Sequence, residues 1–154
     1  MEKKHCIQSL FYNVEQTARI CHTGAESYLK EFAQNKLSFD EYIILEMVLC
    51  FPDVCQRDLA KLILKGSSHT SKLLAILEEK KLIERPVDKK GNRIVRKIIV
   101  TDLGVETYNF VSKILDNYIK SIENVISKQE AADCEIFLNK IKETVIKSGN
   151  IVFE

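Results

Sequence analysis

The most chemically suggestive residues of the chain are a run of short polar side chains that ends in a lysine: Ser67, Ser68, His69, Thr70, Ser71 and Lys72. Hydroxyl and imidazole groups donate and accept hydrogen bonds, and lysine binds phosphate as a point charge. The run is therefore suited to the base edges and phosphates of a nucleic acid. The simpler interpretation is that Ser67 or Ser68 only caps a helix, because a serine at a helix start accepts a backbone N–H.

Positive charge is concentrated around this run. The formal net charge of the whole chain is +1, yet residues 65–97 carry ten basic and four acidic side chains. The segments on either side, 1–64 and 98–154, are both net negative. A basic stretch in a nearly neutral chain is typical of a phosphate-binding surface. A solvated basic hairpin would show the same distribution of charge.

The five cysteines form no disulfide or zinc motif, because their number is odd and no C-x-x-C is present. Free thiols are expected, several of them in the core. The three histidines are scattered, and the sequence has no Gly-rich phosphate loop. We therefore expect no catalytic residue, no metal and no cofactor, and predict that the protein is not an enzyme.

Length and composition indicate a globular protein of ordinary size. The chain has 154 residues, of which 45% are hydrophobic and 29% are charged. This profile is typical of a soluble domain with its own core. No apolar run approaches the about 18 residues of a membrane span, and the first residues do not resemble a signal peptide. We expect a cytoplasmic protein that does not bind membranes.

The spacing of apolar residues predicts four helices in the first half of the chain. Steps of three and four over residues 7–32 predict one long amphipathic helix. A capping box, Ser38 to Glu41, opens a helix that runs from about residue 40 to 50. Short helices are expected over 55–63 and 68–80, separated by Gly66. Two short helices joined by a tight turn form a helix-turn-helix.

The second half predicts a basic hairpin followed by two long helices. Residues 82–87 and 93–100 have strand-like composition, with a polar turn at 88–92 between them. Thr101 is expected to cap a helix of about 25 residues, and a capping box at Ser127 opens the last helix. The long helices at both ends of the chain carry more apolar surface than so small a core can bury. This surplus predicts a two-fold homodimer.

This order of elements resembles the MarR family of winged helix-turn-helix transcription regulators. The matching segments are Leu37-Ser38, Cys55-Gln-Arg-Asp-Leu-Ala-Lys61, Ser68 through Arg85, and Asn92-Arg93 through Gly104. The resemblance implies a mainly α fold with a small β-hairpin wing. Dimerisation helices at 1–36 and 102–154 would surround a DNA-binding region at 37–101, all within one integrated domain.

The sequence departs from the family pattern at three positions. Lys81 stands where the family commonly has glycine, so the turn must take another route or hold lysine in a less favoured conformation. Asn92 replaces an aspartate that would orient Arg93 in the wing. Cys55 replaces the usual serine or threonine at a helix N-cap.

The resemblance implies that the helix over 68–80 enters the major groove of double-stranded DNA and that the hairpin reaches a flanking minor groove. The residues expected to contact DNA are Gln56, Arg57, Ser67, Ser68, His69, Thr70, Ser71, Lys72, Lys89, Lys90, Asn92 and Arg93. Gln56 and Arg57 would touch backbone phosphates. A lysine-rich hairpin that serves only solubility is the alternative for the wing.

Regulators of this family respond to small phenolic or lipophilic ligands, or to oxidants through cysteine. A ligand cleft would be lined by Phe11, Tyr12, Tyr28, Phe32 and Tyr108, although aromatic residues at helical spacing are more often plain core. Redox candidates are Cys6, Cys134 and Cys55, because helix starts and neighbouring lysines favour a thiolate. The predicted function is a dimeric DNA-binding regulator, a repressor released by a small ligand or by oxidation. The alternative is a winged-helix adaptor that binds proteins.

Overall fold

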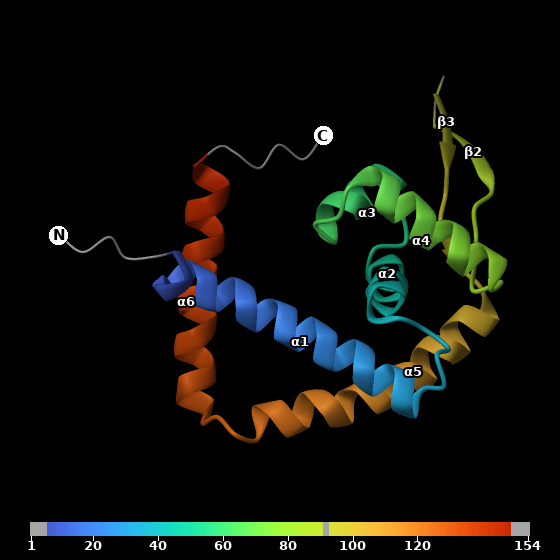
Figure 1. Ribbon diagram of the computed structural model, residues 1–154. Helices are drawn as coiled ribbons and strands as arrows, with labels where there is room; N and C mark the ends of the chain where they lie inside the picture. The colour runs from blue at the N-terminus through green and yellow to red at the C-terminus, as the bar shows by residue number, and fades with distance from the viewer. Residues whose placement is uncertain (1–5, 91–92, 149–154) are drawn as a thin grey trace. The chain divides into compact units, whose positions relative to one another are not determined.

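The computed structural model describes residues 6–90 and 93–148, and the side chains of residues 88–95 lie outside that description. The chain divides into two compact units, residues 1–115 and 116–154. The described part of the first unit contains a 3-10 turn (Cys6–Gln8), four helices, four short strands and the start of a fifth helix (Figure 1). The described part of the second unit contains the rest of that helix and one more. The expected class, mainly α with a β-hairpin wing, is confirmed.

The predicted helix over 7–32 is present but begins later. Helix α1 spans Leu10–Phe32, and Ser9 is its N-cap, with its side chain accepting the N–H of Tyr12 at 3.2 Å. The serine side chain satisfies a backbone donor at the helix start, so the preceding residues form a separate turn. After α1 the chain turns through Gln34 and Asn35, which both have positive φ, at 54° and 56°.

Helices α2 (Phe39–Cys50), α3 (Gln56–Leu62) and α4 (Ser67–Glu79) form the predicted helix-turn-helix unit. Both halves of the expected capping box between Ser38 and Glu41 are present. The cap of α4 was predicted wrongly. Its N-cap is Gly66, which makes no side-chain bond, so neither Ser67 nor Ser68 is the cap.

The core lies entirely in the first unit, among the described residues. Its fully buried side chains come from α1, α2, α3, α4, the strands and α5, and include Leu29, Ile44, Leu59, Leu74, Ile83 and Val111. All five cysteines are free and none is buried, so the expectation of core cysteines is wrong for the single chain. Cys21 and Cys50 lie on helix faces that the rest of this chain leaves open.

The strands pair as two consecutive antiparallel ladders. Strand β1 (Ile83–Glu84) pairs with β4 (Ile99–Val100), and β2 (Val87–Lys90) pairs with β3 (Arg93–Arg96). Proline has no N–H for a ladder, and Pro86 lies where the first pairing stops. Residues 88–90 of the predicted turn belong instead to β2, and residues 91–92 lie outside the described residues.

Lys81 is held in the left-handed conformation, with φ of 60°, which is the second of the two alternatives that the sequence left open. It ends α4 in a Schellman motif: the Lys81 N–H donates to the Glu78 carbonyl and the Leu82 N–H to the Leu77 carbonyl, both at 2.9 Å. The Lys81 carbonyl then accepts the hydroxyl of Thr101 at 2.8 Å. One strained residue therefore connects α4 to the start of the next long helix.

Helix α5 (Asp102–Glu123) is capped by Thr101, as predicted, through the N–H of Gly104 at 3.0 Å. Gly104 allows α5 to approach the chain at Leu82, because a Cβ there would lie 2.1 Å from the Leu82 carbonyl oxygen. Helix α6 (Lys128–Lys147) opens with the predicted capping box at Ser127. None of the described helices is long and apolar enough to cross a membrane.

Replacing Lys81 by glycine should raise the free energy of unfolding by about 1 kcal/mol, because only glycine adopts positive φ without a steric penalty. Denaturant unfolding at a fixed protein concentration measures the change. Lys81→Ala is the matched control, since it removes the long side chain and keeps the Cβ. Equal stabilisation by both variants would show that the lysine side chain, and not its φ, carries the strain.

Gly104→Ala should lower the free energy of unfolding by about 1–3 kcal/mol, the usual cost of overpacking. The added methyl group would meet a backbone oxygen at 2.1 Å and Val100 Cγ1 at 2.7 Å. Gly66→Ser serves as the control, because a Cβ at Gly66 meets nothing within 4 Å. Thermal and denaturant melts of both variants test this, and an unchanged Gly104→Ala protein would contradict the close approach of α5.

Candidate nucleic-acid interface

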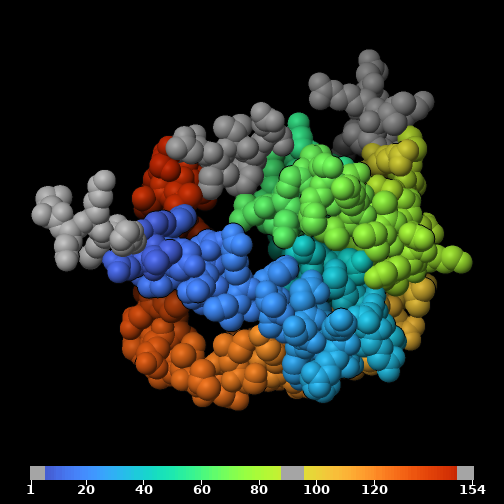
Figure 2. Space-filling model, viewed as in Figure 1, coloured from blue at the N-terminus to red at the C-terminus, as the bar shows by residue number. Residues whose placement is uncertain are grey.

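The first two turns of α4 present polar and cationic side chains to solvent. Ser67, Ser68, His69 and Lys72 are exposed and Ser71 is partly exposed. We call these five residues the α4 surface. Figure 2 shows α3 and α4, in green, on the visible face of the molecule. Figure 1 shows strands β2 and β3 of the hairpin on the same side of the first unit as α4.

Thr70 does not belong to this surface. Its side chain is fully buried, and its hydroxyl donates to the Gly66 carbonyl at 3.2 Å. The sequence analysis placed it among the DNA-facing residues because its neighbours are polar, but a helix turns it inward to the core. Its hydroxyl is satisfied within its own helix, which is why a threonine is tolerated there.

The start of α4 leaves its backbone donors open. The N-cap Gly66 contributes no side-chain acceptor, so the first N–H groups of α4 are not capped by a neighbouring side chain. Such groups, together with the helix dipole, favour an anion. On α3, Arg57 is exposed and Gln56 is partly exposed, and the Arg57 guanidinium lies 3.8 Å from Asp58.

The basic residues predicted for the wing lie on the two strands of the hairpin. Lys89 and Lys90 lie on β2, and Lys90 is paired with Arg93 of β3, while Asn92 lies outside the described residues. The side chains of Lys89, Lys90 and Arg93 are likewise outside that description. At the base of the wing Arg85 binds Glu78 of α4 through two nitrogens, and its hydrogen bond lowers the pKa of the Glu78 carboxyl. Arg85 therefore ties the wing to α4.

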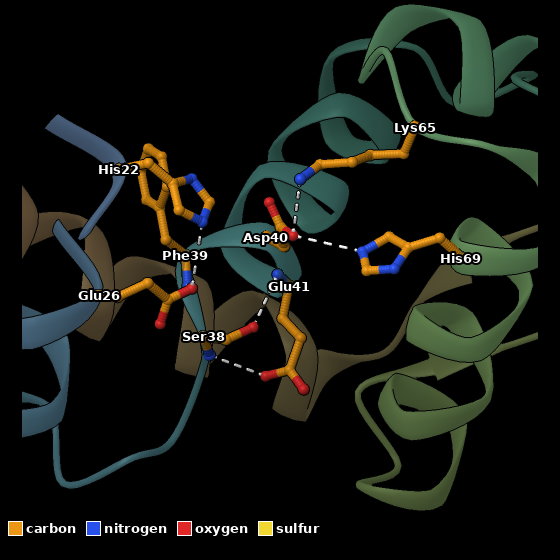
Figure 3. Close-up of polar contacts among 8 residues, drawn as sticks. All are labelled: His22, Glu26, Ser38, Phe39, Asp40, Glu41, Lys65 and His69. Atoms are coloured by element: carbon orange, nitrogen blue, oxygen red, sulfur yellow. Dashed lines mark hydrogen bonds and ion pairs between the residues drawn. The ribbon is translucent and has the colours of Figure 1, made fainter. Parts of the chain in front are cut away.

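Asp40 contacts the α4 surface from the first turn of α2, which the sequence analysis did not foresee. Its Oδ2 lies 3.1 Å from Nζ of Lys65 and 3.4 Å from Nε2 of His69 (Figure 3). His69 and Asp40 are 29 residues apart in sequence. The only sequence feature that could have indicated this contact was a carboxylate at a helix start. Such carboxylates are common because they interact favourably with the helix dipole, so the feature does not point to His69.

The start of α2 is itself held by carboxylates from two elements. Glu26 of α1 accepts the N–H of Phe39 at 2.8 Å, and His22 lies 4.0 Å from the same Glu26 oxygen. Glu41 accepts the N–H of Ser38 at 2.9 Å (Figure 3) and Nζ of Lys80 at 2.8 Å. Although Glu41 is buried, its charge is paired and hydrogen-bonded, as a buried charge requires.

The five aromatic residues predicted to line a ligand cleft are not gathered in one place. Tyr28 and Phe32 pack together near the end of α1, with ring centroids 4.5 Å apart. Phe11 and Tyr12 lie in the first turn of the same helix, about 30 Å away at 1.5 Å per residue. Tyr108 belongs to a separate cluster, stacked on Tyr42 at 5.1 Å.

The Tyr42 and Tyr108 hydroxyls share one carboxylate oxygen of Glu46, at 3.2 and 3.1 Å. Burial is the main reason why the pKa of the Tyr108 phenol is raised, and the neighbouring Tyr42 and Glu46 raise it further. The Tyr108 phenol therefore stays protonated, and both hydroxyls donate to Glu46. The sequence did not predict this polar aromatic cluster between α2 and α5, because Tyr42 and Glu46, four residues apart, have the spacing of any two neighbours on one helix face.

The redox candidates differ in their surroundings. Cys6 and Cys134 are exposed, whereas Cys55 is partly buried and donates its thiol to Asp58 at 2.9 Å. That hydrogen bond lowers the pKa of the Asp58 carboxyl. The neighbour of the Cys55 sulfur is thus an anion, not the cation that activates a thiol. Among the described residues no group of three or more His, Cys, Asp or Glu side chains could hold a metal ion.

The sequence matches no known family model and no curated protein. Its structure, however, is similar to many solved ones. The MepR–DNA complex of Staphylococcus aureus superposes with a TM-score of 0.76 at 22% identity, covering 89% of this chain and 98% of MepR. AbsC, a MarR family transcriptional regulator from Streptomyces coelicolor, gives 0.78 at 16% identity, covering 96% and 99%.

A third similar structure is the organohalide-sensing transcriptional regulator RdhR with bound 2,4-dichlorophenol. Its TM-score is 0.78 at 16% identity, and the alignment covers 100% of this chain and 93% of RdhR. These identities are low, so the likeness is one of fold. It extends over nearly the whole chain and includes the helix-turn-helix, the hairpin and the long helices. The chain therefore has the winged-helix fold of the MarR family of transcription regulators.

Proposed function

We propose that the protein is a MarR-family transcription regulator that binds double-stranded DNA with sequence specificity as a homodimer. The observation that carries this proposal is the α4 surface, a polar and cationic helix start exposed beside a basic hairpin. The same fold has been solved on DNA in MepR. We assign the protein no catalytic role, and a cytoplasmic location follows from this function.

On DNA, α4 enters the major groove and the hairpin follows the adjacent minor groove. Ser67, Ser68, His69, Ser71 and Lys72 face base edges and nearby phosphates, and the open N–H groups of α4 bind phosphate. Gln56 and Arg57 contact the backbone from α3. Lys89, Lys90, Asn92 and Arg93 supply the wing, where a narrow minor groove concentrates negative potential. Thr70 is buried and takes no part.

A second subunit would explain the apolar surface that this chain leaves open. No described residue of 116–148 is buried. Exposed apolar residues on the long helices include Leu10, Phe11, Ile20, Phe110, Ile119, Ile122, Ile136 and Ile146. A two-fold dimer through residues 1–36 and 102–154 covers such faces and leaves the region 37–101 to bind DNA. Two copies then place two α4 helices on two half-sites about one DNA turn apart.

The signal that releases DNA is a small phenolic or lipophilic ligand, or an oxidant. RdhR was solved with dichlorophenol and PcaV of Streptomyces coelicolor with its natural ligand, both on this fold. Of the aromatic residues, Tyr28 with Phe32 and Tyr108 with Tyr42 form separate clusters, either of which offers ring faces. Cys6 and Cys134 are accessible to oxidants. We propose that the protein acts as a repressor.

Binding to a duplex selected from a random-sequence pool tests the function. The selected site should be pseudo-palindromic. Lys72→Ala should weaken binding by about 1–3 kcal/mol and relax the preference at one position per half-site if Lys72 reads a base. Arg93→Ala should weaken binding to all duplexes and reduce the salt slope by about one unit per lost phosphate contact. Fluorescence anisotropy at several salt concentrations measures both.

Lys81→Ala, at an exposed lysine after the last turn of α4, is the matched control and should bind like the wild type. If Lys72→Ala and Arg93→Ala also bind like the wild type, the assignment of α4 and the wing is wrong. If the wild-type protein selects no duplex at all, the protein is better explained as a winged-helix adaptor for a protein partner.

Oxidation should lower operator affinity if Cys6 forms a disulfide with Cys134 of a second subunit. Peroxide oxidises a thiolate to a sulfenic acid, which condenses with the second thiol and releases water. The measurements are non-reducing gel mobility and DNA affinity after cumene hydroperoxide, for wild type, Cys6→Ser and Cys134→Ser. Unchanged wild-type affinity, or equal loss in both Ser variants, excludes this pair. The same assay with 2,4-dichlorophenol then tests the small-ligand alternative.

A further inference from the structure

We propose that Asp40 is a positioning residue for sequence reading, which fixes the His69 ring so that it accepts a hydrogen bond from an amino group of adenine or cytosine. The inference rests on the proposed function and deepens it. Asp40 does not itself face DNA in this scheme. It acts through His69, the only ring on the α4 surface.

The geometry determines which ring nitrogen carries the proton. Asp40 Oδ2 lies 3.4 Å from Nε2 of His69, and a carboxylate only accepts hydrogen bonds. Nε2 must therefore be the N–H. In a neutral imidazole the other nitrogen, Nδ1, then carries a lone pair and accepts. Figure 3 shows that this second nitrogen is the one not directed at Asp40.

An acceptor at this place discriminates between bases. In the major groove adenine presents its N6 amino group and cytosine its N4 amino group as donors, whereas guanine and thymine present acceptors at the corresponding positions. The amino bases are therefore the partners of a ring held in this way. A freely rotating imidazole could instead donate its N–H to the acceptors of guanine, and would then bind guanine as well as adenine or cytosine.

Asp40 is itself held firmly enough to act as an anchor. It lies in the first turn of α2, whose backbone N–H groups are bound by Glu26 at Phe39 and by Glu41 at Ser38. The Asp40 side chain is only 21% exposed, and the Lys65 ammonium group lies 3.1 Å from the same oxygen that faces His69. Lys65 thus balances the charge of Asp40, which would otherwise repel DNA phosphates.

The conservative variant separates hydrogen bonding from charge. Asp40→Asn keeps an oxygen acceptor, and the neighbouring Lys65 cation orients that oxygen toward itself and His69. Asp40→Ala removes the acceptor altogether. We therefore expect Asp40→Ala to lose the orientation of His69 and Asp40→Asn to retain it. Both variants remove one negative charge, so both should bind an unrelated duplex as well as wild type or better.

The experiment uses the full chain and the duplex that wild type selects from a random-sequence pool, with each position changed in turn to all four bases. At about pH 8 imidazole groups are mostly neutral. Wild type should prefer adenine or cytosine at one position of each half-site. Asp40→Ala and His69→Ala should each reduce that preference about 3- to 10-fold, and the double variant should lose no more than either single one. Asp53→Asn, at an exposed carboxylate between α2 and α3, controls for charge.

A second measurement needs no DNA. The nitrogen-15 shifts of the His69 ring in the free protein should report the Nε2–H form alone for wild type and Asp40→Asn, and a mixture of two forms for Asp40→Ala. A folded Asp40→Ala protein is verified by its thermal melt.

Three results would overturn the inference while leaving the proposed function intact. These are an unchanged base preference in Asp40→Ala, an equal loss of affinity for all duplexes, or Asp40→Asn behaving like Asp40→Ala. A wild-type protein that selects no duplex would instead overturn the proposed function, and this inference with it.

Discussion

The first turn of α2 is the point on which the first unit depends. The two N–H groups at its start are bound by carboxylates from different elements, Glu41 of α2 itself and Glu26 of α1. The adjacent Asp40 contacts the start of α4, through Lys65 just before the helix and His69 in its first turn. Glu41 contacts the other end of α4 through Lys80, which follows its last turn. Negative charge at this helix start is favoured by the dipole of α2. One turn therefore fixes the direction of α4.

Through the start of α2, short polar contacts connect α4, the candidate DNA-reading helix, to α1. Because Glu41 is buried and paired with Lys80, shifting α4 along α2 would leave a charge without a partner. The Schellman turn at Lys81 and the Arg85–Glu78 pair extend the constraint from α4 to the wing. The helix and the hairpin are thus held as one body, which is the condition for reading two adjacent grooves at a fixed spacing.

Local rules predicted most elements of the fold from the sequence, because caps and glycine positions act within a few residues. The capping boxes at Ser38 and Ser127 are such cases, whereas the strained conformation of Lys81 was only one of two alternatives. The errors came from burial. Thr70 resembles its polar neighbours in type but is turned into the core, and Cys21 and Cys50 lie on apolar faces that this chain does not cover. The Asp40–His69 contact depends on tertiary packing across 29 residues, which helical periodicity does not encode.

The distribution of buried surface separates two tasks in the chain. The described residues up to Leu115 contain the whole core, whereas those from 116 onward bury no side chain and leave apolar faces open. The core and the contacts of α2 therefore keep the shape of the reading unit independent of what covers α6. In the proposed dimer, the second unit sets the distance between two such reading units. A ligand or a disulfide that changes this distance would then alter DNA binding without altering α4, because two rigid readers can occupy two half-sites only at the correct spacing.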